Sequence, residues 1–440
     1  MSSPELYNLT ASEVQRRIQA NELLLEDYVQ SLLGRYRARD KDVNAWAYIE
    51  PENVLKQARQ LDQIPPEKRG SLHGFVIGVK DVMLTKDLPT RHNSQAHTTD
   101  GPLLDASSVA ILRRNGALIM GKTRTTEFAA TTVNPGTKNP HDPSRSPGGS
   151  SSGTGAGVAD KQIPIGLGTQ TVGSVIRPSS FNGIFGLKPT WNAISAEGQK
   201  VSSVTLDTFG FMARSIEDLQ ALADTFSLRD DEPPKPIQLS EARFALVKTP
   251  VWPKAGPGTI AAMERAAQLL KDVGATVDEV TLPSEFDNLL SLQNTVLQAE
   301  AGVAFYREYN TTRDKMSDEL VDMAKNIDTC SKKNFLRAFD KIASLRPKID
   351  EIADRYTAIL TPSSVDVAPI GIGWTGNSCF NGIWTALHTP VLNIPGLGGE
   401  NDMPVGVSFV TSRYRDQHLL QVGKAVGPVF AEKGGWKSSL

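Results

Sequence analysis

Residues 106–128 read ASSVAILRRNGALIMGKTRTTEF, and their pattern decides the fold class. Apolar residues at helical spacing come first, a glycine turn follows, and a short apolar run completes the stretch. A helix, a turn and a buried strand in this order form the repeating unit of a parallel α/β sheet. The segment 243–283 has the same organisation, because a helix around TIAAMERAAQLLKDVG separates the strand patterns RFALVKTP and ATVDEVTLP. We therefore predict an α/β protein.

The stretch FVIGVKDVML at 75–84 predicts a neighbouring strand that is apolar on both faces, yet Lys80 stands in its middle. Ionised lysine is almost never fully buried without a partner, because removing the charge from water costs several kcal/mol. Two explanations are open. Either a carboxylate such as that of Asp81 meets the ammonium group, or the amine is neutral and takes part in chemistry.

Helical and strand patterns flank this core. The segment LTASEVQRRIQANELLLEDYVQSLLGRYRARD at 9–40 opens with a capping box, Thr10 with Glu13, and predicts two amphipathic helices. Residues 289–356 read mostly as helices. The short strands AILTPSS and PVGVSFVTS follow, and the helix DQHLLQVGKAV comes last.

The composition argues for a small-molecule partner. The 440 residues carry a formal net charge of −2, so no overall field favours nucleic acid or a membrane surface. The two cysteines, Cys330 and Cys379, are far apart, which argues against a disulfide framework and a structural zinc site. Neither an apolar leader nor a run of membrane-spanning length is present, and we expect a soluble, cytoplasmic protein.

The segment 134–157, rich in Asn, Pro, Ser and Gly, predicts a long loop and contains SPGGSSSGTGAG. A phosphate-binding loop is one interpretation, but GxxxxGK[ST] is absent and Val158 replaces the last glycine of GxGxxG. A nucleophile elbow is another, because Gly149, Ser151 and Gly153 satisfy GxSxG, but the preceding NPHDPSRSP cannot be a central strand. A third interpretation joins this loop to Lys80 and Ser174, because Ser-Lys variants of the catalytic triad need no histidine.

The motifs GVKD, SPGGSSSG and GTQTVGSVIRPSSFNGIFGLKPT, in this order and at these separations, resemble the amidase signature family of Ser-Ser-Lys amide hydrolases. The similarity extends from LTASEVQRRI to FNGIWTALHTPVLNIP and MPVGVSFV, and so covers nearly the whole chain. It implies one α/β domain, 1–440, with a central mixed, mostly parallel sheet covered by helices on both faces. Within it we expect N-terminal helices at 1–65, a catalytic core at 66–225 and a remainder at 226–440.

The resemblance also implies the catalytic residues and the reaction. The catalytic lysine falls on Lys80, the bridging serine, which follows a cis peptide bond, on Ser150, and the acyl-forming serine on Ser174. Ser151 and Ser152 are the nearest alternatives for the bridging serine. The implied reaction is hydrolysis of a small-molecule carboxamide to an acid and ammonia or an amine, with no cofactor or metal. A homodimer is common for such enzymes.

The family's oxyanion hole falls on the backbone N–H groups of Thr171, Val172, Gly173 and Ser174. This chain has Gln170 and Val172 where many members have Asp and Gly. Gln170 keeps its hydrogen-bonding ability but loses a charge, so an ion pair made by that acid would be missing. Because a β-branched residue resists positive φ, we expect Val172 at negative φ with its side chain trimming the pocket.

Several alternatives stay open at this level. Arg177 is interpreted as a structural ion-pair former rather than a substrate clamp. A different function is that of an amidotransferase subunit, which releases ammonia from glutamine for a partner protein, and another is a binding protein on an amidase scaffold. Four aromatic residues could equally lie in the core or the pocket: Phe128, Trp374, Phe380 and Trp384.

Overall fold

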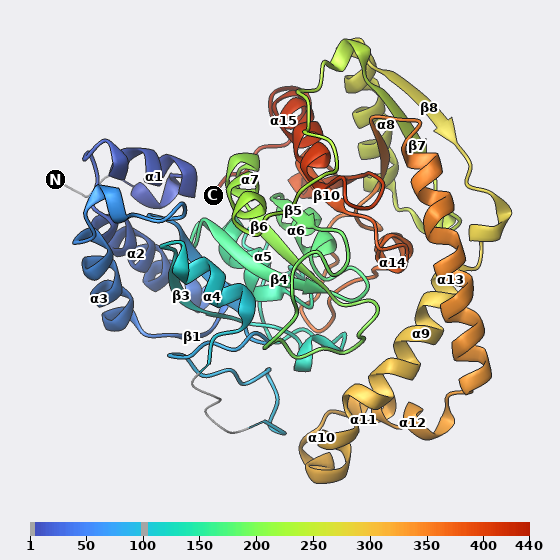
Figure 1. The fold of residues 1–440 in the computed structure, drawn as a ribbon, viewed down its shortest axis with the longest axis horizontal. Coiled ribbons are helices and arrows are strands. Elements are labelled where there is room, and N and C mark those ends of the chain that lie inside the picture. The colour runs from blue at the N-terminus through green and yellow to red at the C-terminus, as the bar shows by residue number, and fades with distance from the viewer. Residues whose placement is uncertain (1–4, 98–103) are drawn as a thin grey trace.

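The computed structural model describes residues 5–97 and 104–440, and one sheet runs through them (Figure 1). Its strands are β1 (Trp46–Ile49), β2 (Val76–Lys80), β3 (Leu118–Thr123), β4 (Ile165–Gln170), β5 (Phe185–Lys188), β6 (Thr208–Ala213), β7 (Arg243–Val247), β8 (Thr276–Val280), β9 (Ala358–Pro362), β10 (Val391–Gly398) and β11 (Pro404–Val410). The eleven strands lie in the order β1-β3-β2-β4-β6-β5-β10-β11-β9-β7-β8. The internal boundaries expected at 65 and 225 stay a prediction.

The sheet is mixed, as expected, but its parallel pairs are in the minority. Four neighbouring pairs are parallel, β2 with β3 and β4, and β7 with β8 and β9. The other six pairs are antiparallel, and they include all the contacts of β5, β6, β10 and β11. The parallel pairs occur where a helix connects the strands, at the two units that the sequence identified, while the middle of the sheet is antiparallel.

Helices cover both faces of this sheet. They are α1 (Ala11–Gln19), α2 (Leu25–Val43), α3 (Pro51–Asp62), α4 (Ser107–Arg114), α5 (Ser152–Ala159), α6 (Ile176–Asn182), α7 (Ile216–Thr225), α8 (Pro257–Asp272), α9 (Leu289–Ala304), α10 (Tyr306–Thr311), α11 (Asp318–Ala324), α12 (Asn326–Thr329), α13 (Lys332–Ala353), α14 (Cys379–Ala386) and α15 (Asp416–Lys433). No helix of the described residues is long and apolar enough to cross a bilayer.

Alternating side chains of the strands form two separate hydrophobic cores. On β2, Ile77 and Val79 enter one core and Val76 enters the other. Helices α4, α7, α8 and α15 pack into the first core, and α2, α3, α5, α9, α13 and α14 pack into the second. The inner strands such as β2 are thus buried on both faces, which explains why they read as nearly continuous apolar runs.

One helix starts where the sequence predicted, and another starts inside the predicted loop. At α1, the Thr10 side chain accepts from the Glu13 N–H and the Glu13 carboxylate accepts from the Thr10 N–H, which confirms the predicted capping box. The loop expected to continue to Gly157 instead ends at α5, which starts at Ser152. Small residues allow this helix to pack closely, since a Cβ added at Gly153 would meet the Ala45 carbonyl oxygen at 2.1 Å.

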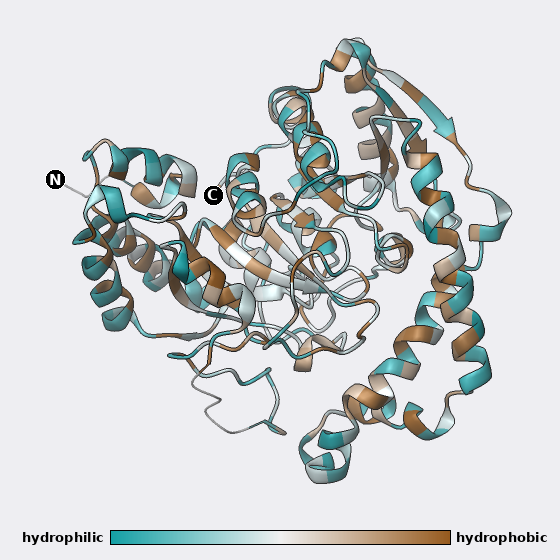
Figure 2. Cartoon of the chain, in the orientation of Figure 1, coloured by the Kyte–Doolittle hydropathy of each residue, from teal (hydrophilic) through white to brown (hydrophobic). Residues whose placement is uncertain are grey.

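The predicted helical region 289–356 is confirmed as α9 to α13. These helices extend from one side of the sheet, and α9 and α13 lie side by side (Figure 1). Teal and brown bands alternate along both helices in Figure 2, as expected for helices with one apolar face. Their apolar residues, including Val296, Ala338, Ile342, Leu345 and Ile349, belong to the second core.

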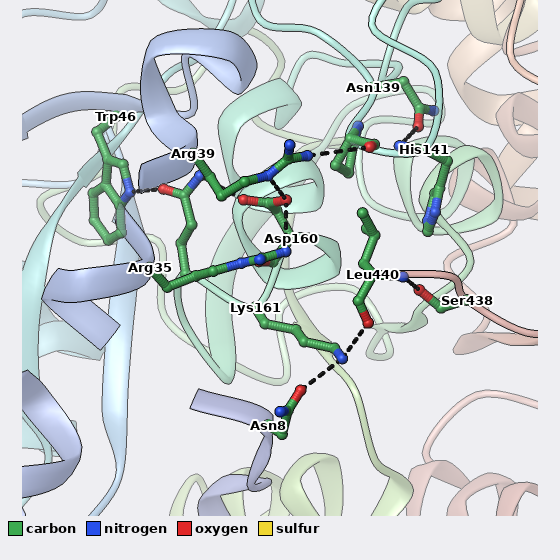
Figure 3. A network of polar contacts seen from close by, with 12 residues as sticks. Asn8, Arg35, Arg39, Trp46, Asn139, His141, Asp160, Lys161, Ser438 and Leu440 are labelled. Atoms are coloured by element: carbon green, nitrogen blue, oxygen red, sulfur yellow. Dashed lines mark hydrogen bonds and ion pairs between the residues drawn. The ribbon is translucent and has the colours of Figure 1, made fainter. Parts of the chain in front are cut away.

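A polar network fastens the N-terminal helices to the end of α5 (Figure 3). Asp160 follows α5, and its buried carboxylate lies 3.2 Å from Arg35 Nη2 and 3.0 Å from Arg39 Nε, both from α2. Beside it, Trp46 Nε1 donates to Gln162 Oε1 at 2.7 Å. This network joins α2 and β1 to the helix that follows the serine-rich loop.

We predict that Asp160→Ala destabilises the fold. The substitution leaves two guanidinium groups without their buried partner, so the free energy of unfolding should fall by about 3 kcal/mol. Urea unfolding followed by circular dichroism measures the change. The control is Asp322→Ala, which breaks an exposed ion pair with Lys325 at 2.9 Å and should cost at most about 1 kcal/mol. Equal losses in both variants would show that the Asp160 network does not hold the fold.

Candidate active site

Lys80 is the last residue of β2, and its side chain is completely buried. Its Nζ lies 2.8 Å from Ser150 Oγ, 2.8 Å from Thr169 Oγ1 and 3.3 Å from the Thr169 carbonyl oxygen. Thr169 belongs to β4, which is parallel to β2, so both strands bring their carboxyl ends to one edge of the sheet. The expected strand to Leu84 is wrong in its second half, because the Lys80 carbonyl accepts from the Val82 N–H at 2.7 Å and the chain turns there.

The environment of Lys80 favours the neutral amine. Burial lowers the pKa of Lys80 well below its ordinary value, and the charge of Asp207 opposes this shift. Asp81, the partner considered from the sequence, pairs instead with Lys122, whose Nζ lies 3.4 Å from Asp81 Oδ1. No carboxylate among the described residues forms an ion pair with Lys80. Of the two explanations for a lysine here, the structure supports the neutral amine.

Ser150 sits on a tightly packed turn before α5. The peptide bond between Gly149 and Ser150 is cis, as the resemblance implied. A Cβ added at Gly149 would lie 2.5 Å from Thr375 Cγ2, so the turn admits only glycine there. The Gly149 carbonyl accepts a hydrogen bond from Arg177 Nη2, and the Ser150 carbonyl accepts one from the Thr126 N–H at 3.3 Å. These contacts direct the Ser150 hydroxyl toward Lys80.

Ser174 lies in the loop that connects β4 to α6. Three carbonyl oxygens of this loop accept hydrogen bonds: Thr171 from Gln293 Nε2 at 3.5 Å, Val172 from Thr385 Oγ1 at 2.8 Å, and Gly173 from the Arg177 N–H at 3.0 Å. The N–H groups of residues 171–174, in contrast, have no acceptor in the described part of the chain. Three of these residues line the cavity, so N–H groups of this loop are available to a negatively charged oxygen bound there.

The Gln170 side chain forms hydrogen bonds at the end of the same loop. Its Oε1 accepts from the N–H groups of Val175 at 2.9 Å and Ile176 at 3.0 Å, and its Nε2 donates to Thr385 Oγ1 at 3.1 Å. Thr385 in turn binds the Val172 carbonyl. Val172 has negative φ, as predicted, and the residue is part of the cavity lining. The glutamine therefore connects the start of α6 to Thr385 of α14 through neutral hydrogen bonds.

Ser150 and Ser174 line the same cavity, which has a volume of about 240 Å³. Lys80 lies behind Ser150 and does not reach the cavity wall. The two serine hydroxyl groups are not hydrogen-bonded to each other, and Ser174 Oγ has no partner among the described residues. The structure thus brings Lys80 and Ser150 into contact and leaves Ser174 open to a ligand. The rest of the lining comes from residues 129–132, Thr171, Val172, Arg177, Ser202, Leu297, Met323 and 374–378.

Arg177 differs from its expected role as an ion-pair former. Its guanidinium donates to the carbonyl oxygens of Gly149 and Gly376, and to Thr375 Oγ1 at 3.4 Å. No ion pair with a carboxylate of the described residues is present. The arginine is nevertheless structural, because it connects the turn before Ser150 to the loop 374–378.

Asp207 is a buried acid that sequence reasoning missed. It accepts from Thr171 Oγ1 at 2.6 Å and from the Ser202 N–H at 2.7 Å. Burial raises the pKa of Asp207 to about 6, although hydrogen bonds from Thr171 and the Ser202 backbone oppose the shift. No local motif marks this residue, because its partners are a loop distant in sequence and its own turn.

Helix α9 places three site-supporting side chains on one face, at the spacing i, i+4 and i+7. Gln293 contacts the Thr171 carbonyl, and Leu297 lines the cavity. Glu300 accepts from the Thr205 N–H at 3.1 Å and from the Thr205 hydroxyl at 2.8 Å, and it also accepts from Ser203. One helix therefore contacts the loop at 171–174, the cavity and the turn before Asp207.

The four aromatic residues left open by the sequence divide between the core and the cavity. Phe128, Phe380 and Trp384 are buried. Trp374 is 49% exposed and lines the cavity, so among these four only its ring contacts a ligand space.

Comparison with known proteins agrees with this geometry. A family model described as Amidase matches residues 27–420. The chain belongs to the amidase family. Membership makes it an amide-hydrolysing enzyme, and it confirms the resemblance inferred from the three motifs.

Two solved structures and one curated relative illustrate the similarity. This amidase superimposes on a crystal structure of an amidase with a TM-score of 0.87 and 26% identity, over 96% of this chain and 100% of that one. A peptide amidase from Stenotrophomonas maltophilia matches with a TM-score of 0.82 and 26% identity, over 99% of both chains. A glutamyl-tRNA(Gln) amidotransferase subunit from Streptomyces coelicolor is 27% identical over 98% of each chain.

We predict that Gln170→Leu slows the amidase. The substitution keeps the size of the side chain but removes the hydrogen bonds that hold Val175, Ile176 and Thr385, so the loop at 171–174 loses its support. Because small misplacements at a reacting centre can cost about 100-fold, we expect kcat to fall about 10- to 100-fold with a smaller change in KM.

Steady-state kinetics on one amide tests this prediction. Gln268→Leu, on the exposed face of α8, is the matched control and should leave kcat unchanged. A kcat of Gln170→Leu equal to that of the control would mean that the loop keeps its geometry without the glutamine.

Proposed function

We propose that Ser174, Ser150 and Lys80 act together as the catalytic triad of this amide hydrolase. The observation that carries the proposal is the 2.8 Å contact between Lys80 Nζ and Ser150 Oγ. This lysine is buried and has no carboxylate partner in the part of the chain that the structure describes. A neutral amine in this position can donate to the two oxygens of Thr169 and still accept a proton from Ser150.

In the proposed reaction, Ser174 Oγ attacks the carbonyl carbon of the amide. The Ser174 proton passes to Ser150 Oγ, while the Ser150 proton passes to Lys80 Nζ. The C–N bond then breaks, and the proton returns through Ser150 to the leaving nitrogen, which departs as ammonia or an amine. Water attacks the acyl-enzyme by the same proton path and releases the acid. Every group used belongs to this chain.

The negatively charged oxygen of the tetrahedral intermediate would bind the N–H groups of Thr171, Val172, Gly173 and Ser174. Each well-placed donor of this kind contributes roughly 3 kcal/mol to the stability of the transition state. The unpaired N–H groups and the bound carbonyl groups of the loop support this assignment. A Cβ at Gly173 would lie 2.4 Å from Asn381 Oδ1, so a side chain there would displace the loop.

The remaining expectations concern the binding partner, the location and the oligomeric state of the enzyme. A small-molecule amide as the partner fits the volume of the cavity and the net charge of −2. A cytoplasmic location and a homodimer stay predictions, as does the absence of a nucleic-acid partner.

A second candidate function is that of an amidotransferase subunit, favoured by curated relatives such as the Streptomyces coelicolor protein. In that function, the acyl group on Ser174 would come from glutamine, and the ammonia would pass to a partner protein. Glutaminase activity that appears only with a co-purified partner would support this alternative. A binding protein without activity is a third alternative, and it predicts that Ser174 is unreactive.

We predict that a fluorophosphonate labels Ser174 and that Ser174→Ala loses nearly all turnover while remaining folded, because only a hydroxyl group is removed. Peptide mass spectrometry locates the label, and amide hydrolysis gives the rate. Ser151→Ala is the matched control, since Ser151 Oγ donates to the Thr169 carbonyl at 3.4 Å and lies outside the proposed triad. A label on Ser151, or a greater loss in Ser151→Ala than in Ser150→Ala, would contradict the assignment.

We also predict that Lys80→Arg is about as inactive as Lys80→Ala. Arginine keeps a positive charge but cannot lose its proton in a protein, whereas the proposed base must be neutral. Because the pKa of Lys80 is lowered, the protonated and inactive form exists only below that pKa, and the acylation rate of the native enzyme should rise as pH increases through it.

Single-turnover acylation measured across pH tests this prediction. The rising limb should be absent in Lys80→Arg. Substantial activity in Lys80→Arg, with normal labelling of Ser174, would show that the lysine is a structural cation and that the proton goes elsewhere.

A further inference from the structure

One part of the cavity wall beyond Ser150 and Ser174 is apolar, and it comes from several parts of the chain. The other part is formed by polar residues: Thr131, Thr132, Thr171, Arg177, Ser202, Thr375, Asn377 and Ser378. In the apolar part, Val172 follows β4, Leu297 belongs to α9, Met323 to α11, and Trp374 to the loop before α14. Trp374 presents a half-exposed ring, while Met323 is 8% exposed within a small cluster that includes Phe128 and Phe305. A ligand in this cavity therefore meets hydrocarbon and sulfur over much of its surface.

Backbone contacts hold this wall in place. Residues Val133 and Trp374 pair as an antiparallel bridge, and the Thr375 N–H donates to the Thr132 carbonyl at 3.1 Å. Thr132 also contacts α11, because its N–H donates to the Glu319 carboxylate at 2.9 Å. The loop with Trp374 and the helix with Met323 are thus both joined to Thr132, which indicates a preformed wall.

The charges around the cavity select against an ammonium group. Arg177 is the only charged residue of the described lining, and no carboxylate lines the cavity. Asp207 lies behind the wall and already accepts hydrogen bonds from Thr171 and Ser202. A substrate ammonium group would lose its water, find no acid and meet the Arg177 charge, which is unfavourable at short range.

A substrate carboxylate gains little from Arg177. The guanidinium already donates to the carbonyl oxygens of Gly149 and Gly376 and to Thr375, and the residue is 5% exposed. A carboxylate would lose its water without gaining a bidentate partner. The lining therefore favours a group without charge.

The volume limits the size of this group. A dry cavity of about 150 Å³ is enough for benzene. At about 240 Å³, this cavity has room for one aromatic ring or a short alkyl chain together with the carboxamide, and a second large group on the amide would lie outside it.

We propose that the enzyme hydrolyses small uncharged carboxamides with an apolar acyl group of up to one aromatic ring, and that Trp374 selects this group. The inference rests on the proposed function, since it places the acyl group on Ser174. It excludes glutamine as a good substrate, because glutamine brings an ammonium group into a cavity without an acid.

A series of matched amides tests the charge preference. Pentanamide, 5-aminopentanamide and 5-amino-5-oxopentanoate have chains of similar length that end in a methyl, an ammonium and a carboxylate group, and 3-phenylpropanamide and glutamine complete the series. We expect kcat/KM for pentanamide and 3-phenylpropanamide to exceed that of each charged amide at least tenfold. A charged amide hydrolysed as well as pentanamide would overturn the proposal.

Variants of the wall test the residues. Trp374→Ala should lower kcat/KM for 3-phenylpropanamide about tenfold, with less than a threefold change for acetamide and no change in the fluorophosphonate labelling rate. Trp252→Ala removes a tryptophan that does not line the cavity and is the control. Leu297→Glu places an acid in the wall and should raise the ratio of 5-aminopentanamide to pentanamide hydrolysis at least tenfold over its neutral match, Leu297→Gln.

The outcomes separate this inference from the proposed function. If Ser174 is not labelled and none of the amides is hydrolysed, the proposed triad itself fails. If Ser174 is labelled but neither pentanamide nor 3-phenylpropanamide is hydrolysed, only the substrate class is wrong. The same holds if Trp374→Ala leaves the ratio of 3-phenylpropanamide to acetamide hydrolysis unchanged and Leu297→Glu leaves the ratio of 5-aminopentanamide to pentanamide hydrolysis unchanged.

Discussion

The site depends on a lysine that is buried without a carboxylate partner among the described residues. Three neutral oxygen atoms surround Lys80 Nζ, one from Ser150 and two from Thr169. Such a shell can hydrogen-bond to an amine but cannot balance a full charge, and burial accordingly lowers the pKa of Lys80. The sheet makes this possible, because β2 lies between β3 and β4, and the parallel strand β4 brings Thr169 alongside the lysine.

In the described part of the chain, the loop around Ser174 has paired carbonyl oxygens and unpaired N–H groups. Its carbonyl oxygens are bound by Gln293, Thr385 and the Arg177 N–H, so its N–H groups are left for a ligand. Gln170 supports the loop with neutral hydrogen bonds, where many members of the family have an Asp. The side chain at position 170 therefore adds no negative charge next to the N–H groups at which an oxyanion would form. The substitution of glutamine for an acid is therefore compatible with the chemistry of the family.

Sequence reasoning succeeded where the signal is local or repeated. The capping box at Thr10, the helices between 289 and 356, the units around β3 and β7, and the negative φ of Val172 all follow from residue type and spacing. It also named Lys80, Ser150 and Ser174, of which the structure joins the first two and places the last two on one cavity. The start of α5 was missed because serine and glycine normally favour loops, and only close packing against Ala45 makes a helix favourable there. The roles of Arg177 and Asp207 depend on distant carbonyl and hydroxyl groups, which no local pattern reveals.

Helix α9 gives the enzyme a link between substrate range and rate. Gln293 holds the Thr171 carbonyl, Leu297 lines the cavity, and Glu300 holds the turn at 203–205, all from one face of the helix. A substitution that shifts α9 to admit a larger substrate also shifts the groups that hold the N–H donors. Substitutions in α9 that enlarge the cavity for new amides are therefore constrained, because a movement of this helix also changes the position of the loop at 171–174. The half-exposed side chain of Trp374 lies outside α9, so a substitution there can change the size of the pocket without moving this helix.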